Sequence, residues 1–195
     1  MMQMSSVENL IRANKASGQD TLIGYFPAGF PNMDDSIVAC IAMCEAGIDI
    51  LELGIPYSDP VMDGLVIQEA TEIALANGFR TKDAFDIVRE IRQRVETPIL
   101  VMSYWNPVMQ FGVRAFAEEL KASGAQGLIT PDLIPDEAKE WLQVSDELEL
   151  DRVFMATPSS SNNRLEQAAK FSRGFVYAVS TMGITGVRED LDAKA

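Results

Sequence analysis

The chain has 195 residues, 47% of them hydrophobic and 23% charged, which is enough for the core of one domain. Its 16 basic and 29 acidic side chains leave a formal charge of −13, so nucleic acid and anionic membranes are excluded as expected partners. Histidine is absent, which excludes Ser-His and Cys-His nucleophiles and histidine-ligated metals, and no metal site is predicted.

The composition also bears on location. No window approaches the roughly 18 unbroken apolar residues that a membrane span needs. The first six residues, Met1–Ser6, lack the basic region and apolar run of a secretory signal. We therefore expect a cytoplasmic protein.

Short apolar runs alternate with amphipathic stretches along the chain. The compact, nearly unbroken apolar character of the runs suits strands of a parallel sheet that is covered on both faces. The expected strands are 21–26, 48–53, 99–103, 128–130, 153–156 and 175–180. The expected helices are 7–17, 33–46, 81–95, 113–123, 135–147 and 162–172.

The helix expected at 33–46 shows how its ends and faces are predicted. Asn32 is its expected N-cap, with Asp35 three residues on. Cys40 and Cys44 lie four residues apart on its apolar side. A metal or redox pair is conceivable there, but buried cysteine behaves as a small hydrophobe, so core packing is favoured.

Gly47, Gly124 and Gly174 each stand between an expected helix and the expected strand that follows it. Glycine is the residue expected where a helix ends. No Pro/Gly/Ser-rich linker or charge run divides the chain. We therefore predict one domain over residues 1–195, with residues 1–20 forming an N-terminal tail and helix.

Repeated βα units predict an α/β fold, either a TIM (β/α)8 barrel or an open doubly wound sheet. No G-x-G-x-x-G fingerprint follows the first strand, which favours the barrel. About six of the eight βα units are present, whereas a full barrel typically needs about 250 residues. We therefore expect the barrel domain to be C-terminally incomplete.

Glu52 interrupts the apolar run 48–54, where a carboxylate is costly unless it is paired, hydrogen-bonded or protonated. A structural glutamate bonded to backbone N–H groups is an equally good interpretation. The next segment, 54–64, reads as a long shaped loop and contains Asp59 and Asp63. These could be ordinary turn residues, or one could form an acid/base pair with Glu52.

Six long motifs are spread over nearly the whole chain. The most specific is ELGIPYSDPVMDG at 52–64. The others are LIGYFPAGFP at 22–31, PILVMSYWNPV at 98–108, GLITPDLIPDEA at 127–138, ATPSSSNNRL at 156–165 and GFVYAVSTMGITGVRE at 174–189. Together they resemble the motifs of the tryptophan synthase α subunit family.

The resemblance implies a carbon–carbon lyase that cleaves indole-3-glycerol phosphate to indole and glyceraldehyde 3-phosphate in tryptophan biosynthesis. Glu52 would shuttle the proton between indole C3 and the glycerol hydroxyl, and Asp63 would bond the indole N–H. Tyr177 would support Glu52, although a core aromatic is the alternative for this position. We expect a raised pKa for Glu52 in its apolar strand and an ionised Asp63 in the loop.

Further roles are also implied by the resemblance. The substrate-binding residues would be Tyr25, Met102, Tyr104, Pro131, Thr185 and Gly186, the last two in a loop that closes over the site. Gly54, Pro56 and Asp59 would contact the β subunit in an α2β2 tetramer. The β subunit would carry the pyridoxal phosphate, and no cofactor is expected in this chain.

The resemblance also marks departures. The family usually has Pro after Asp63-Gly64, where this chain has Leu65. Its phosphate site is formed largely after strands seven and eight, which would lie beyond Ala195. Two interpretations therefore remain beside each other: a lyase whose sequence is incomplete, or an inert remnant that still contacts the β subunit. A sister barrel of the tryptophan pathway is less favoured, because none of the expected strands contains its catalytic lysine.

Overall fold

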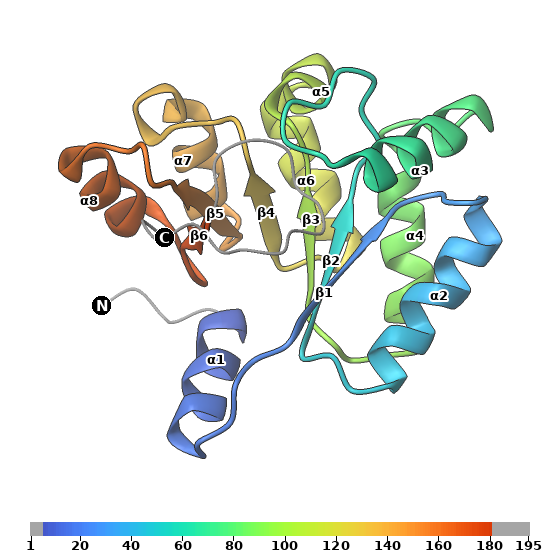
Figure 1. Cartoon of the computed structure of the whole chain (residues 1–195), viewed down its shortest axis with the longest axis horizontal. Coiled ribbons are helices and arrows are strands. Elements are labelled where there is room, and N and C mark those ends of the chain that lie inside the picture. The colour runs from blue at the N-terminus through green and yellow to red at the C-terminus, as the bar shows by residue number, and fades with distance from the viewer. Residues whose placement is uncertain (1–5, 181–195) are drawn as a thin grey trace.

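The computed structural model describes residues 6–180. Within them, six parallel strands form one curved sheet in the order β1-β2-β3-β4-β5-β6 (Figure 1). The strands are β1 Ile23–Pro27, β2 Ile50–Gly54, β3 Ile99–Met102, β4 Gly127–Thr130, β5 Asp151–Ala156 and β6 Tyr177–Ala178. Neighbours in space are neighbours in sequence, which is the order of a barrel wall, whereas a doubly wound sheet reverses direction. The predicted barrel architecture is therefore confirmed over its described part.

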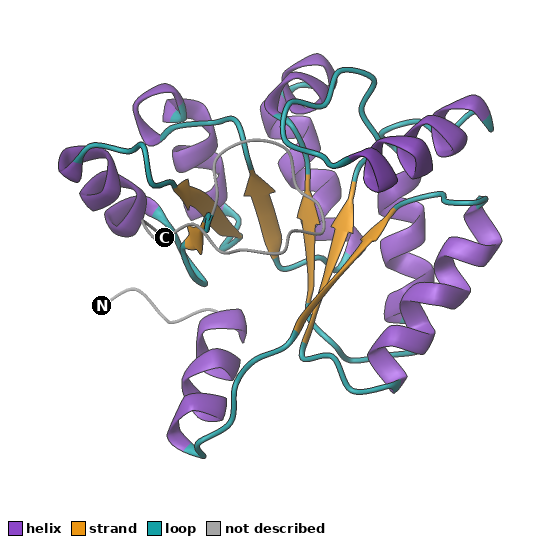
Figure 2. Ribbon diagram, viewed as in Figure 1, coloured by secondary structure: helices purple, strands orange, loops and turns teal. Residues whose placement is uncertain are grey.

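The helices that follow the strands lie on the outer side of this sheet (Figure 2). They are α2 Met33–Glu45, α3 Leu65–Ala76, α4 Asp83–Arg92, α5 Trp105–Phe111, α6 Val113–Ser123, α7 Lys139–Glu147 and α8 Asn162–Phe171, with a 3₁₀ turn η1 at Pro135–Glu137. The helix α1 Ser6–Ala16 precedes the first strand and lies elsewhere. All of the predicted helices are present, most within two residues of their expected ends, although the 81–95 helix spans only Asp83–Arg92. The predicted helix 135–147 is divided, because Ala138 leaves helical geometry with φ −92° and ψ 18° before α7 begins.

Two helices were not predicted. In α3 the buried positions are only Ala70, Thr71 and Ala74, while Leu65 and Val66 are exposed, so no single apolar face appears in its sequence. In α5 there are only seven residues, with Pro107 in its first turn, which is too short for a helical period to show.

The strand limits were wrong at the end of the sheet. Strand β5 begins at Asp151, two residues before the predicted start at Val153. The start was missed because Asp151 and Arg152 are polar, yet both are buried. The Arg152 guanidinium reaches Asp146, the Ser145 hydroxyl and the Phe171 carbonyl, which satisfies its charge in the interior. In β6 only two residues pair with β5, instead of the six expected.

Each face of the sheet packs into its own apolar cluster. On the convex side, strand residues such as Leu53, Val101 and Phe154 pack with helix residues such as Phe116 and Trp141. The concave side holds a smaller cluster of Ile50, Leu100, Ile129, Val153 and Val7. Val7 comes from α1, which lies across the N-terminal ends of the strands and closes the floor of the barrel (Figure 1).

Several local predictions are confirmed. Asn32 caps α2, where its side chain accepts a hydrogen bond from the backbone N–H of Asp35 at 3.0 Å. Gly124 ends α6 at φ +93°, a conformation that other residues rarely adopt. Cys40 and Cys44 are free thiols buried in the convex cluster. Across residues 6–180 the helices are too short or too polar to cross a membrane.

Candidate active site

The strand register brings the predicted site residues to the concave face of the sheet. Tyr25 of β1 is the register partner of Glu52 of β2, and Met155 of β5 is the partner of Tyr177 of β6. Partners in adjacent parallel strands point to the same side. Met102 lies two residues after Leu100, the partner of Glu52, so its side chain also points to the concave face. A ring of mixed polar and apolar groups therefore lies above the concave apolar cluster.

Glu52 is buried, with 4% of its surface exposed. The residues below it on β2 and β3, Ile50 and Leu100, are hydrocarbon and fully buried. Burial alone raises the pKa of Glu52 to about 7. Among residues 6–180, no hydrogen bond opposes this rise.

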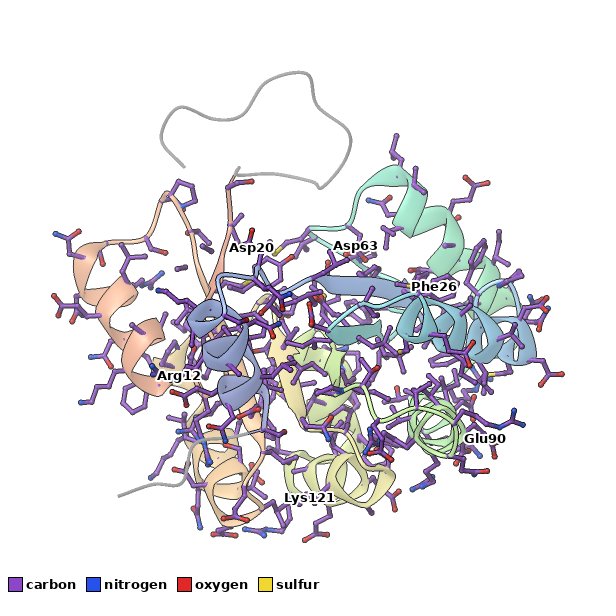
Figure 3. All side chains as sticks on the ribbon, turned by 90° about the horizontal axis from the view of Figure 1, so that it is seen from below. Arg12, Asp20, Phe26, Asp63, Glu90 and Lys121 are labelled. Carbon is purple, nitrogen blue, oxygen red and sulfur yellow. The ribbon has the colours of Figure 1, made fainter. Side chains whose placement is uncertain are left out.

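Asp63 is held in the loop between β2 and α3. The Tyr104 hydroxyl donates a hydrogen bond to the Asp63 carboxylate at 3.1 Å and accepts one from the Met62 N–H at 3.0 Å. The Gln68 side chain donates to the Asp63 carbonyl at 2.7 Å. Burial raises the pKa of Asp63, and the hydrogen bond from Tyr104 opposes the rise. Figure 3 shows Asp63 on the concave side, opposite Glu90 and Lys121 of the outer helices.

Tyr104 joins this loop to the turn after β3. Its ring lies against that of Tyr57, with centroids 5.3 Å apart, and the Asn106 amide donates to the Tyr57 hydroxyl at 3.2 Å. The backbone N–H of Trp105 donates to the carboxylate of Asp132, from the loop after β4, at 2.8 Å. Tyr104 is thus fixed from both sides, which in turn fixes the direction of its bond to Asp63.

Tyr25 and Tyr177 bring two further hydroxyl groups to the same space. The pKa of Tyr25 is raised first by burial and then by the nearby carboxylates of Asp63 and Glu52. The pKa of Tyr177 is raised by burial and by Glu52. Tyr177 is 36% exposed and lies on the last strand of the sheet, beside Met155.

The other predicted residues are placed differently. Pro131 follows β4 and lines a small cavity together with Met155. Of the predicted subunit contacts, Asp59 is exposed, whereas Gly54 and Pro56 are buried. Thr185 and Gly186 lie outside the described residues.

Met155 and Tyr57 also lie beside the predicted residues, although neither was predicted from the sequence. Met155 is half-buried on the concave face beside Tyr177, and the two-residue alternation along β5 could have identified it. Tyr57 packs against Tyr104 from a loop, and no sequence period marks such a contact.

This arrangement suits proton transfer without a metal. One carboxyl group is in apolar surroundings that favour its neutral form, and a second is hydrogen-bonded in a loop, so the two groups can hold different protonation states. The tyrosine rings offer flat walls for an aromatic substrate. Among residues 6–180, no group of three or more His, Cys, Asp or Glu side chains could hold a metal ion.

Known sequences resemble this chain over most of its length. A profile of the family described as tryptophan synthase alpha chain matches residues 11–195. The tryptophan synthase alpha chain of Leifsonia xyli subsp. xyli is 60% identical over 192 residues, which are 98% of this chain and 74% of that protein. The corresponding protein of Mycobacterium marinum is 50% identical over 96% of this chain and 69% of its own length.

Solved structures of tryptophan synthases also resemble this chain. Mycobacterium tuberculosis tryptophan synthase superimposes with a TM-score of 0.92 at 49% identity, over 96% of this chain and 72% of that one. A chain of the tryptophan synthase complex from Pyrococcus furiosus gives a TM-score of 0.77 at 41% identity, over 81% and 65% of the two chains. With the family profile, the concave-face carboxylates and the barrel topology in agreement, this chain belongs to the tryptophan synthase alpha chain family.

Proposed function

We propose that this chain is the lyase subunit of a tryptophan synthase and cleaves indole-3-glycerol phosphate to indole and glyceraldehyde 3-phosphate. The observation that carries the proposal is the buried Glu52, with a pKa of about 7, on the same concave face as the Tyr104-bound Asp63. Nothing in the comparisons favours the alternative of an inert remnant.

In the first step, protonated Glu52 donates its proton to C3 of the indole ring. Protonation at C3 is needed because an indole carbanion is a poor leaving group. The ring becomes an indoleninium cation, and its positive charge is concentrated at the nitrogen. The Asp63 carboxylate accepts a hydrogen bond from this N–H and stabilises the charge as it develops.

In the second step, the glycerol hydroxyl next to the bond that breaks returns a proton to the Glu52 carboxylate. The hydroxyl oxygen forms the aldehyde C=O as the carbon–carbon bond breaks, and the electron pair of that bond restores the aromatic ring. The nitrogen loses its positive charge, and Glu52 is protonated again. A pKa of about 7 suits a group that must both donate and accept a proton near neutral pH.

The indole rings of substrate and product would lie between the aromatic side chains of the site. Tyr25 and Tyr104 come from neighbouring sides of Glu52 and supply the walls, Tyr177 supports the carboxyl group, and Met102 lies on the same concave face. Pro131, Thr185 and Gly186 complete the proposed substrate-binding set.

The proposed partner is a tryptophan synthase β subunit, in an α2β2 tetramer. Among the matched structures, the one from Pyrococcus furiosus is a tryptophan synthase complex. The exposed Asp59 would contact the partner directly, with Gly54 and Pro56 shaping the loop behind it. Pyridoxal phosphate would be bound by the β subunit, and this chain would need no cofactor.

The function is tested by incubating the chain with indole-3-glycerol phosphate, with and without a β subunit, and measuring release of glyceraldehyde 3-phosphate. Glu52→Gln and Asp63→Asn should each lower kcat by about 100-fold or more, because each removes a proton-handling group. Glu69→Gln, an exposed carboxylate on α3, is the matched control and should leave kcat unchanged.

Two results would contradict the proposal in different ways. If the chain releases no product even with the β subunit, the function is wrong. If it is active but Glu52→Gln retains the kcat of the parent chain, the role given to Glu52 is wrong while the function stands.

A further inference from the structure

Gly54 lies at the C-terminal end of β2, where the strand enters the loop that holds Asp63. It is two residues after Glu52, so a side chain at this position would point to the same concave face. Its backbone is paired on both sides, with Pro27 of β1 and Met102 of β3 as register partners. Gly54 is also buried, so it offers no surface of its own to a partner protein.

The ring of Tyr25 occupies the space that a side chain at Gly54 would fill. A Cβ atom built there would overlap the Tyr25 hydroxyl, and would lie 2.6 Å from its Cζ and 2.7 Å from its Cε2. Gly54 is not among the residues with positive φ, so its backbone conformation is open to other amino acids. Glycine is therefore required here for space and not for backbone freedom.

This contact decides where the Tyr25 hydroxyl lies. The backbone of Tyr25 is the register partner of Glu52, and the far end of the Tyr25 ring reaches Gly54. The ring therefore lies along β2, beside the Glu52 carboxyl group. Its hydroxyl is close enough to Asp63 and Glu52 for both charges to raise its pKa. A tyrosine side chain has only two torsions, so a ring displaced from Gly54 cannot bend away and must swing as a unit.

We propose that Gly54 is a positioning residue of the lyase site, which lets the Tyr25 ring pack against β2 and keeps its hydroxyl beside Glu52 and Asp63. This inference rests on the function proposed above. It gives Gly54 a role inside the site, acting through Tyr25, in place of the direct subunit contact implied by the family resemblance.

The test is a double-mutant cycle on the full chain with the β subunit present. Gly54→Ala should push the Tyr25 ring into the substrate space, raising KM for indole-3-glycerol phosphate and lowering kcat/KM by about 10-fold or more. Tyr25→Leu removes the far end of the ring, so in that background Gly54→Ala should change kcat/KM by less than about 3-fold.

Gly24→Ala is the matched control. Gly24 is also in a strand without positive φ, but a Cβ there would meet side chains on the helix side of the sheet, Met43 at 2.7 Å from its Cε and Ile48 at 3.1 Å from its Cδ1. It should change kcat/KM by less than about 3-fold, since Met43 can move without touching the site.

An equal loss from Gly54→Ala with Tyr25 present and with Tyr25→Leu would overturn the proposal. So would a loss that disappears when the β subunit is in excess, because that result assigns Gly54 to the subunit contact. If the parent chain shows no lyase activity, the proposed function fails. The contact between Gly54 and Tyr25 is then tested by the urea unfolding midpoints of the parent chain, the two single variants and the double variant.

A midpoint that Gly54→Ala lowers only when Tyr25 is present supports this contact. An equal lowering in both backgrounds refutes it.

Discussion

A carboxyl group enclosed by hydrocarbon prefers its neutral form, and Glu52 is in that position. Its pKa is raised from 4.5 to about 7 by burial, while that of the unfolded chain remains near 4.5. Between these values the folded state binds more protons than the unfolded state. The stability contributed by Glu52 is therefore fully present below about pH 4.5 and is lost as the pH rises through 7.

This linkage predicts the behaviour of Glu52→Gln. The amide cannot ionise, so the variant should escape the loss of stability that the parent chain suffers at higher pH. The free energy of unfolding of the variant relative to the parent chain should increase by about 2 kcal/mol between pH 5 and pH 8. Urea unfolding of both proteins at the two pH values measures this difference.

The exposed control Glu69→Gln should show no such change with pH. A constant difference between Glu52→Gln and the parent chain at both pH values would mean that Glu52 titrates normally in the folded state. That result would also remove the basis for its assignment as a proton donor near neutral pH.

At the scale of single elements, α3 begins at Leu65, which is 74% exposed. The family resemblance implies proline at this position. The preceding Gly64 is extended, with φ −74° and ψ 164°, which is the conformation that a following proline favours. The first turn of a helix also tolerates the missing N–H of proline.

Leu65→Pro should therefore stabilise the chain. Proline restricts the unfolded state at a position whose folded conformation it already matches, and this should raise the free energy of unfolding by about 0.5–1 kcal/mol. Thermal unfolding measures the effect. Leu65→Ala is the control, since it removes the same exposed side chain without restricting φ, and it should leave stability nearly unchanged. A lower midpoint for Leu65→Pro would show that the Leu65 N–H is needed.

At the scale of the whole molecule, two apolar clusters hold the sheet from opposite sides. The convex cluster is formed with the helices that alternate with the strands, and the concave cluster depends on α1. Val7 of α1 is fully buried among Ile50, Leu100 and Val153. The apolar cluster below the site is thus completed by α1, the helix that precedes the first strand.

Val7→Ala should lower the free energy of unfolding by about 2 kcal/mol, because it removes two buried methyl groups and leaves a cavity. Val38→Ala, on the outer surface of α2 with 65% of Val38 exposed, is the matched control and should change stability by less than about 0.5 kcal/mol. Urea unfolding measures both. Equal effects of the two substitutions would show that α1 does not contribute to the core.

Much of this fold could be predicted, because burial imposes a period on the sequence. The strand at Ile99 is an unbroken apolar run and the strand at Ile50 is apolar except for Glu52, since helices cover one face and the barrel interior the other. Asp151 and Arg152 were missed because buried polar residues break this pattern. The cost of burying Arg152 is offset by hydrogen bonds to Asp146 and to the Phe171 carbonyl, which lie in other elements. The helix α3 was missed because its outer side carries apolar residues.

By itself, the sequence determined the family and the order of the six strands, and it marked Glu52 and Asp63 as candidate site residues, since these depend on residue type and local spacing. Only the tertiary structure decided that Tyr104 bonds Asp63 and that Tyr25 fills the space at Gly54. Both contacts join segments on different strands or loops. Their distances are set by strand register and sheet curvature, which are properties of the packed chain and leave no local period in the sequence.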